Sequence, residues 1–321
     1  MKIKKFLNNL KTSLFIFQKK MFSINNFDNH LVIYFLTLRI RKKLKNKVQE
    51  TNLSEFGLNQ NPRDKKIILS LTTFPERINS VSKTIKTLLN QTLKPDRVLL
   101  WLAFEQFENK EKDLPKELLE LQNFGLEIKW CNDIRSYKKL IPALKEFPNE
   151  IIITFDDDIY YPNNIVEKLY ESYLKNPNCI HANRSRRFFV ENDEIYSKTS
   201  AQNYWIKYDD CSYLNKLTGC GGVLYPPNSL DSRVMDENKF REIIPTQDDV
   251  WFWAMAVLAG TKIKNVMGYD IQLQTVENTQ AFGLSKINSK KGKGIDSLDA
   301  SRIMAKAYPE LLEKLKEENN V

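Results

Sequence analysis

The sequence predicts an α/β fold with a mainly parallel sheet and helices on both of its faces. From Lys65 onward, short apolar runs alternate with longer segments whose apolar residues recur at helical spacing. Repeated units of this kind fold as parallel strands joined by helices. Polar and acidic residues follow several of the apolar runs and so lie at the carboxyl ends of the expected strands. Ligands bind at this edge of parallel sheets. The expected strands are 67–72, 97–102, 126–130 and 151–155, with helices at 78–91, 114–123 and 136–147 between them.

The first strand and helix illustrate the pattern. Residues 67–72 read Ile-Ile-Leu-Ser-Leu-Thr, a short and largely apolar run that suits a buried strand. Residues 78–91 place Val81, Ile85 and Leu88 on one face of a helix, and that face would pack on the sheet.

The second half of the chain is less regular. We expect a helix that ends at Lys175, a short strand at 179–182, a polar and aromatic stretch at 183–217 and a final helix at 298–318. Residues 281–296 are rich in Gly, Ser and Lys. They suit either a solvated linker or a mobile segment that closes over a diphosphate with Lys290, Lys291 and Lys293.

The charge of this 321-residue chain is unevenly distributed. Residues 1–50 carry twelve Lys or Arg against Asp28 and Glu50, a local net charge of +10, so the overall +9 leaves the remainder at −1. Because the residues after position 50 carry almost no net charge, they would bind nucleic acid poorly, and no nucleic-acid partner is expected. The aromatic and basic clusters of 1–50 fit either an interfacial membrane anchor or a helical arm packed on the domain.

Cysteine and histidine are too sparse for several common kinds of site. The four cysteines are widely spaced and the chain has only His30 and His181, which argues against zinc and against a Ser-His-Asp triad and favours a reduced, cytosolic protein. No apolar run approaches the ~20 residues of a membrane helix, and the N-terminal residues do not resemble a signal peptide. We expect a cytoplasmic protein, in which residues 1–50 contact the inner face of the cytoplasmic membrane if they form the anchor rather than the packed arm.

Three consecutive aspartates follow the apolar run at 151–155. In an extended segment Asp156 and Asp158 would project to the same side and Asp157 to the opposite side. Two carboxylates on one face would suit Mg²⁺ or Mn²⁺ shared with substrate phosphates. The alternatives are a solvated acidic loop and carboxylates that cap the next helix.

Two later motifs add candidates for a substrate site. Residues 218–227 read Thr-Gly-Cys-Gly-Gly-Val-Leu-Tyr-Pro-Pro, and their glycines allow close backbone approach. This segment is interpreted as the floor of a pocket, with a plain tight turn as the alternative. Asp248 and Asp249 begin a strongly apolar helix, where they either cap the helix and complement its dipole or form a second acidic pair. Trp251 and Trp253 follow and could stack on a sugar or a base.

Together these motifs resemble those of bacterial nucleotide-sugar glycosyltransferases of the GT-A fold, close to the family 2-like enzymes that build surface polysaccharide. The residues that carry the resemblance are Leu71-Thr-Thr-Phe-Pro-Glu-Arg77, the aspartate triplet, Gly219-Cys-Gly-Gly222 and Asp248-Asp249-Val-Trp. The resemblance covers about 65–275. It makes 61–280 a GT-A (Rossmann-like) catalytic domain, preceded by a basic arm and linker at 1–60 and followed by a mobile loop and C-terminal helix at 281–321.

The resemblance also implies a role for each motif. It makes Asp156 and Asp158 the Asp-x-Asp site for Mn²⁺ or Mg²⁺ and places Asp249, with Asp248 beside it, at the catalytic base. The implied nucleotide-binding residues are Thr73, Arg77, Asp133, Lys139, Asp156 and Asp157, and the implied substrate-binding residues are Gly221, Gly222 and Trp251.

The activity implied is metal-dependent and inverting transfer of one sugar, from a nucleotide-diphosphate sugar to a hydroxyl of a cell-surface glycan or lipid-linked acceptor. The Gln-x-x-Arg-Trp motif of enzymes that polymerise long chains is replaced by Trp251-Phe-Trp253, which favours a single transfer. No C-terminal histidine is present to complete a metal site. The alternatives are a nucleotidyltransferase acting on a sugar phosphate and a non-catalytic protein that binds surface glycans.

Overall fold

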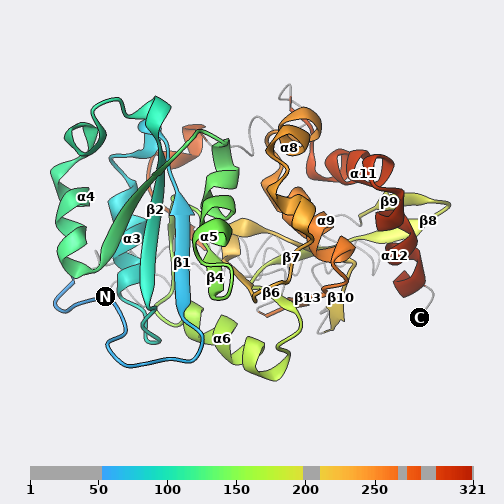
Figure 1. The fold of residues 1–321 in the computed structure, drawn as a ribbon, viewed down its shortest axis with the longest axis horizontal. Coiled ribbons are helices and arrows are strands. Elements are labelled where there is room, and N and C mark those ends of the chain that lie inside the picture. The colour runs from blue at the N-terminus through green and yellow to red at the C-terminus, as the bar shows by residue number, and fades with distance from the viewer. Residues whose placement is uncertain (1–52, 198–209, 267–272, 283–293, 320–321) are drawn as a thin grey trace, which may run out of the picture. The chain divides into compact units, whose positions relative to one another are not determined.

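An eight-stranded sheet organises the residues that the computed structural model describes, which are 53–197, 210–266, 273–282 and 294–319 (Figure 1). The predicted arm at 1–50 and Lys290, Lys291 and Lys293 lie outside these residues. The strand order is β10-β13-β6-β12-β4-β1-β2-β3. These strands are β1 (Ile67–Thr72), β2 (Arg97–Ala103), β3 (Leu126–Cys131), β4 (Ile151–Thr154), β6 (Ile180–Ala182), β10 (Cys211–Ser212), β12 (Val223–Tyr225) and β13 (Ile263–Asn265).

The sheet is mostly parallel, as predicted. Strand β1 runs parallel to both β2 and β4, β2 runs parallel to β3, and β6 runs parallel to β13. Strand β12 is inserted antiparallel between β4 and β6, and β10 is antiparallel to β13. The antiparallel insertion follows directly from the glycine-rich segment, which the sequence analysis treated as a pocket floor rather than the start of a strand.

Helices cover both faces of the sheet and form two separate hydrophobic cores. Neighbouring residues of a strand point to opposite faces, so Ile68 packs in one core while Ile67 and Leu69 pack in the other. The second core includes α3 (Val81–Leu89), α4 (Lys116–Glu120) and α6 (Ile165–Lys175), and the first includes α5 (Ile141–Glu146), α8 (Glu237–Ile243), α9 (Asp248–Leu258), α11 (Ser297–Ala307) and α12 (Pro309–Asn319).

Several predicted helices are shorter or broken. The expected helix at 298–318 is two helices, because Pro309 cannot donate a backbone hydrogen bond and begins α12. The expected helix at 136–147 starts as a separate 3-10 turn, and α4 continues as another 3-10 turn that ends at Gly125, whose φ is 108°.

None of the described helices is long and apolar enough to cross a membrane. The 3-10 turns are η1 (Pro75–Arg77), η2 (Phe104–Gln106), η3 (Lys110–Asp113), η4 (Leu121–Phe124), η5 (Arg135–Lys139), η6 (Gly219–Gly221), η7 (Ser232–Met235) and η8 (Thr279–Phe282).

The polar and aromatic stretch at 183–217 contains short strands wherever it is described. Strand β7 (Ser185–Arg187) pairs with β11 (Asn215–Leu217), and β8 (Phe189–Glu191) pairs with β9 (Glu194–Tyr196). A further pair joins β5 (Ile159–Tyr160), just after the aspartates, to β14 (Gln274–Thr275). Sequence reasoning missed these pairs because each strand is only two or three residues long.

The connections on the two sides of β1 diverge at the carboxyl ends of β1 and β4. Strand β1 leads through α3 to β2 on one side, whereas β3 leads through α5 to β4 on the other side of β1. In open α/β sheets, ligands bind where the connections diverge in this way. The segments that follow β1 and β4 contain Thr73, Arg77 and the three aspartates, so the topology brings these residues to one place.

His181 on β6 makes the stability of the fold depend on pH. Its ring is fully buried, with Nε2 3.0 Å from the carbonyl of Asn176 and Nδ1 2.8 Å from Oγ of Ser172. A neutral ring satisfies both contacts by donating to the carbonyl and accepting from the hydroxyl. Burial lowers the pKa of His181 from 6.5 to about 4, so acid protonates the unfolded chain before the folded one. We expect the free energy of unfolding to fall by about 3 kcal/mol as the pH drops through this interval.

Urea denaturation between pH 7 and pH 4 measures this effect. The variant His181→Asn should start from a lower stability and lack this part of the acid dependence. An identical pH profile in the variant and the wild type would contradict the assignment.

Candidate functional site

The aspartate triplet forms a turn after β4 and does not continue the strand. The turn is fixed by residues far away in the sequence, because the hydroxyl of Thr84 donates to the carbonyl of Asp157 (2.9 Å) and the backbone N–H of Val276 donates to that of Asp158 (2.8 Å). The extended geometry behind the prediction for Asp156 and Asp158 is therefore absent. The prediction that Asp157 projects to the side opposite Asp158 is wrong, because Arg77 pairs with both. The alternation of an extended strand stops where the turn begins.

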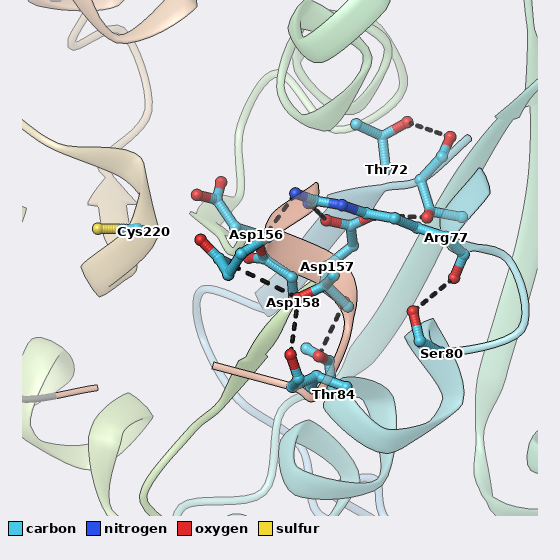
Figure 2. A network of polar contacts seen from close by, with 12 residues as sticks. Thr72, Arg77, Ser80, Thr84, Asp156, Asp157, Asp158 and Cys220 are labelled. Carbon is cyan, nitrogen blue, oxygen red and sulfur yellow. Dashed lines mark hydrogen bonds and ion pairs between the residues drawn. The ribbon is translucent and has the colours of Figure 1, made fainter. Parts of the chain in front are cut away.

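Arg77 holds the second and third aspartates together (Figure 2). Its Nη1 lies 2.5 Å from Oδ1 of Asp157 and its Nη2 lies 3.1 Å from Oδ2 of Asp158. The hydroxyl of Thr73 donates to the other oxygen of Asp157 (2.5 Å), and Gln280 donates to Asp158 (2.8 Å). Burial raises the pKa of Asp157 to about 6, against the opposing effects of Arg77 and Thr73. Thr73 and Arg77 are themselves buried, so they hold the aspartate turn in place.

Lys139 lies at the centre of the remaining carboxylates. Its Nζ is 3.1 Å from Asp156, 2.8 Å from Asp248 and 3.4 Å from Asp249. Burial alone would lower the pKa of Lys139, but the three carboxylates raise it well above the ordinary value, so the side chain is a permanent cation. The lysine is placed by η5, whose last carbonyl accepts the Ser70 hydroxyl from β1 (2.7 Å).

Asp248 and Asp249 at the start of α9 face different partners. Neither caps the helix, because the N-cap residue is Gln247 and has no side-chain capping bond. Asp248 accepts a hydrogen bond from Ser136 (2.8 Å), and burial raises its pKa. Asp249 accepts the backbone N–H of Gly219 (2.9 Å).

The pKa of Asp249 is shifted in the opposite direction from that of its neighbour. Burial on its own would raise it, but the charges of Lys139 and Lys216 and the Gly219 N–H lower it overall. Asp249 is therefore the more readily ionised member of the acidic pair, and its side chain is 22% exposed. An ionised, accessible carboxylate can accept a proton from a bound hydroxyl.

The glycine-rich segment packs directly on this cluster. Gly222 has a φ of 85° and leaves no room for a Cβ beside Phe155, while a Cβ on Gly221 would meet Arg184. Gly219, which the sequence analysis did not select, lies closest to the carboxylates. The hydroxyl of Tyr161 ties the two segments together, because it accepts the N–H of Asp156 (3.0 Å) and donates to the carbonyl of Cys220 (3.1 Å).

Gly219→Ala should disturb the cluster directly. The added Cβ would come within 2.5 Å of Lys139 Nζ and 2.7 Å of Asp249 Oδ1, distances that force one of them to move. We expect a loss of about 1–3 kcal/mol in the free energy of unfolding and a loss of any turnover that needs Asp249. Denaturant melts and turnover of this variant would be compared with Gly260→Ala, where the φ of 80° is strained but the nearest side-chain atom is 3.8 Å away. Turnover unchanged by Gly219→Ala would contradict the placement.

Asp133, one of the implied nucleotide-binding residues, lies after β3 and pairs with Lys138 (2.5 Å). Gln106 also donates to Asp133 (3.0 Å). Trp251 does not line the site, so that prediction is wrong. Its ring is fully buried and its N–H donates to the carbonyl of Val234 (3.1 Å). Trp253 is buried in the same way, because α9 is packed on nearly all sides.

The described residues fit a divalent cation only as a partner of phosphate groups. They contain no cluster of three or more His, Cys, Asp or Glu arranged to hold a metal, and Asp158 is occupied by Arg77 and Gln280. Asp156 is the most accessible of the five carboxylates, with 31% of its side chain exposed. The ion-paired cations of the cluster are Arg77 and Lys139, so negative charge is in excess. Mg²⁺ commonly binds through one or two carboxylates together with substrate phosphates, and Asp156 suits that arrangement.

Comparison with known proteins adds little beyond this geometry. No family model matches the chain, and no curated protein matches it. One of the solved structures that match is TarS of S. aureus, residues 1–349, in complex with UDP. It is 13% identical, the match covers 75% of this chain and 70% of that chain, and the TM-score is 0.46.

Proposed function

We propose that the chain is a glycosyltransferase that moves one sugar from a nucleotide-diphosphate sugar to a hydroxyl of an acceptor. The observation that carries this proposal is the position of Asp249. It is an ionised carboxylate beside a close-packed glycine segment, and Lys139 links it to Asp156, which follows β4. A base and a diphosphate site would then flank one small space.

In the proposed reaction the acceptor hydroxyl attacks the anomeric carbon as the bond from that carbon to the diphosphate breaks. The hydroxyl proton moves to Asp249, and the nucleoside diphosphate leaves. Attack opposite the leaving group inverts the anomeric configuration. Lys139 holds Asp249 and Asp156 in fixed relative positions, and such fixed positions lower the barrier by orienting the reacting groups.

A divalent cation, when bound, would neutralise negative charge that develops on the leaving diphosphate. Asp156 is the residue that we expect to hold it, and Asp158 is expected to act through Arg77 as part of the support for the turn. We propose Mn²⁺ or Mg²⁺, because the available ligands are carboxylate oxygens.

Thermal melts with nucleoside diphosphates test the binding half of this proposal. A ligand at a hundred times its dissociation constant stabilises the folded state by about 2.7 kcal/mol, and Mn²⁺ should increase the shift. Asp156→Asn should remove the effect of Mn²⁺, while Asp64→Asn, at an exposed position, should not. Failure of every nucleoside diphosphate to stabilise the protein, with and without Mn²⁺, would overturn the proposal.

Product analysis tests the catalytic half. A glycosyltransferase releases nucleoside diphosphate from a sugar nucleotide. A nucleotidyltransferase instead releases pyrophosphate from a nucleoside triphosphate and a sugar phosphate. Detection of pyrophosphate as the product would favour this second activity over the one proposed here.

A further inference from the structure

The antiparallel pair β7–β11 presents cationic side chains on one of its sides. Lys216 is directly opposite Arg186 in the register, and Asn215 is opposite Arg187. Directly opposite residues share a face, and Arg187 donates to Asn215 (3.0 Å) on theirs. Lys216 and Arg186 therefore lie together on the other side. Arg184, two residues earlier, continues this side and brings its Nη1 to 3.3 Å from Sγ of Cys220.

Lys216 is buried, and no described residue fully offsets the desolvation cost of its ammonium group. It is 5% exposed, and no hydrogen bond or ion pair joins its ammonium to any described residue. Burial lowers its pKa, and the charge of Arg186 opposite lowers it further, with Asp249 acting against both. A buried ammonium without a partner is costly, and like charges directly opposite destabilise a strand pair. An anion between the two side chains would relieve both penalties.

Strand β11 leads towards the proposed base rather than towards the proposed nucleotide site. The charge of Asp249 raises the pKa of Lys216 against the effect of burial. Gly219, just beyond β11, donates its N–H to the same carboxylate. Thr73, Arg77 and Asp157 come from the segments after β1 and β4 instead. The base accepts its proton from the acceptor, so the neighbourhood of Lys216 belongs to the acceptor side.

We propose that Lys216 and Arg186 form an anion subsite for the acceptor. They bind a phosphate or carboxylate group that the acceptor carries, and so place its hydroxyl beside Asp249. This inference rests on the proposed glycosyltransferase function and narrows its acceptor to an anionic glycan or lipid-linked saccharide. The same cations could meet the diphosphate of the sugar nucleotide, so the test must separate the two sources of anion.

The first experiment measures the affinity for inorganic phosphate by titration calorimetry at constant ionic strength. Hydrogen bonds to charged groups contribute about 1.5–3 kcal/mol, so Lys216→Met should weaken phosphate binding by about tenfold or more. Arg186→Gln provides a second variant at a less buried position, in case Lys216→Met does not fold. Lys175→Met, at an exposed position at the end of α6, is the matched control. Equal phosphate affinity in wild type and both subsite variants would overturn the proposal.

The second measurement uses nucleoside diphosphate with the same variants. If the subsite serves the acceptor, Lys216→Met weakens phosphate binding and leaves nucleoside diphosphate affinity within about twofold. If both affinities fall together, the lysine serves the sugar nucleotide and the acceptor assignment is overturned. If wild type binds phosphate through Lys216 but binds no nucleoside diphosphate, the proposed function fails and the acceptor assignment fails with it. Nucleotide binding without phosphate binding overturns the subsite alone.

Discussion

Asp249→Asn is expected to lower the rate of sugar transfer by about 10²–10⁴-fold, the usual contribution of a positioned general base. Asparagine has the same shape as aspartate and can still accept the N–H of Gly219, so the fold should survive. It cannot take a proton from the acceptor hydroxyl. Nucleoside diphosphate binding, measured by thermal shift, should be nearly unchanged, which separates a loss of chemistry from a loss of the site.

The pH dependence of the wild type gives an independent check on the same residue. The pKa of Asp249 lies below the ordinary 3.8 of aspartate, despite burial, because of Lys139 and Lys216. The base is therefore ionised throughout the pH range above 5, and its protonation should not limit transfer there. A full transfer rate in Asp249→Asn would assign the proton to another group. Asp248→Asn is the comparison, since the raised pKa of Asp248 and its bond to Ser136 suit a supporting role.

Lys139→Met is expected to cause the largest loss of stability, about 3–5 kcal/mol in the free energy of unfolding. The substitution leaves Asp156, Asp248 and Asp249 close together with no ammonium between them. Burial and their mutual repulsion then raise the pKa values of all three carboxyl groups, because the ammonium that opposed this effect is gone. Acid therefore protonates the folded variant more readily than its unfolded chain. The variant should therefore regain part of its stability as the pH falls, and lose it again as the pH rises.

Lys138→Met is the matched control for this experiment. Lys138 is as deeply buried as its neighbour, but its one ion-pair partner among the residues that the structure describes is Asp133, whose side chain is 30% exposed and can be hydrated. Its loss should cost clearly less. Equal urea midpoints for the two variants, or a Lys139→Met variant within about 1 kcal/mol of wild type, would contradict the central role given to Lys139.

The sequence predicted best those elements that are determined by residues close together in the chain. Strands β1 to β4 are short apolar runs, and each lies within a residue of its predicted ends. The meeting of Arg77 with the aspartates also follows from sequence order, because the aspartates come shortly after β4 and Arg77 comes shortly after β1. Strand β12, in contrast, is antiparallel, and nothing in Val-Leu-Tyr distinguishes that direction from the parallel one.

The details of the site depended on contacts between distant residues. The turn at Asp157 and Asp158 is set by Thr84 and Val276, and no pattern within the triplet predicts it. Trp251 was misjudged because its neighbours in the sequence are acidic, while its neighbours in space belong to the core. Lys216 gave no local signal, since only the pairing of β7 with β11 sets it opposite Arg186.

The ammonium of Lys139, which three carboxylates share, also constrains the order in which the chain can fold. Lys139 and Asp249 are separated by 110 positions along the chain, and they meet only after η5, β4 and α9 have docked. Closing so long a loop costs conformational entropy, and this cost arises before the ion pairs of Lys139 can stabilise the chain. The cluster around Lys139 should thus be among the last parts of the protein to acquire its native arrangement, and no partly folded state that lacks α9 could contain it.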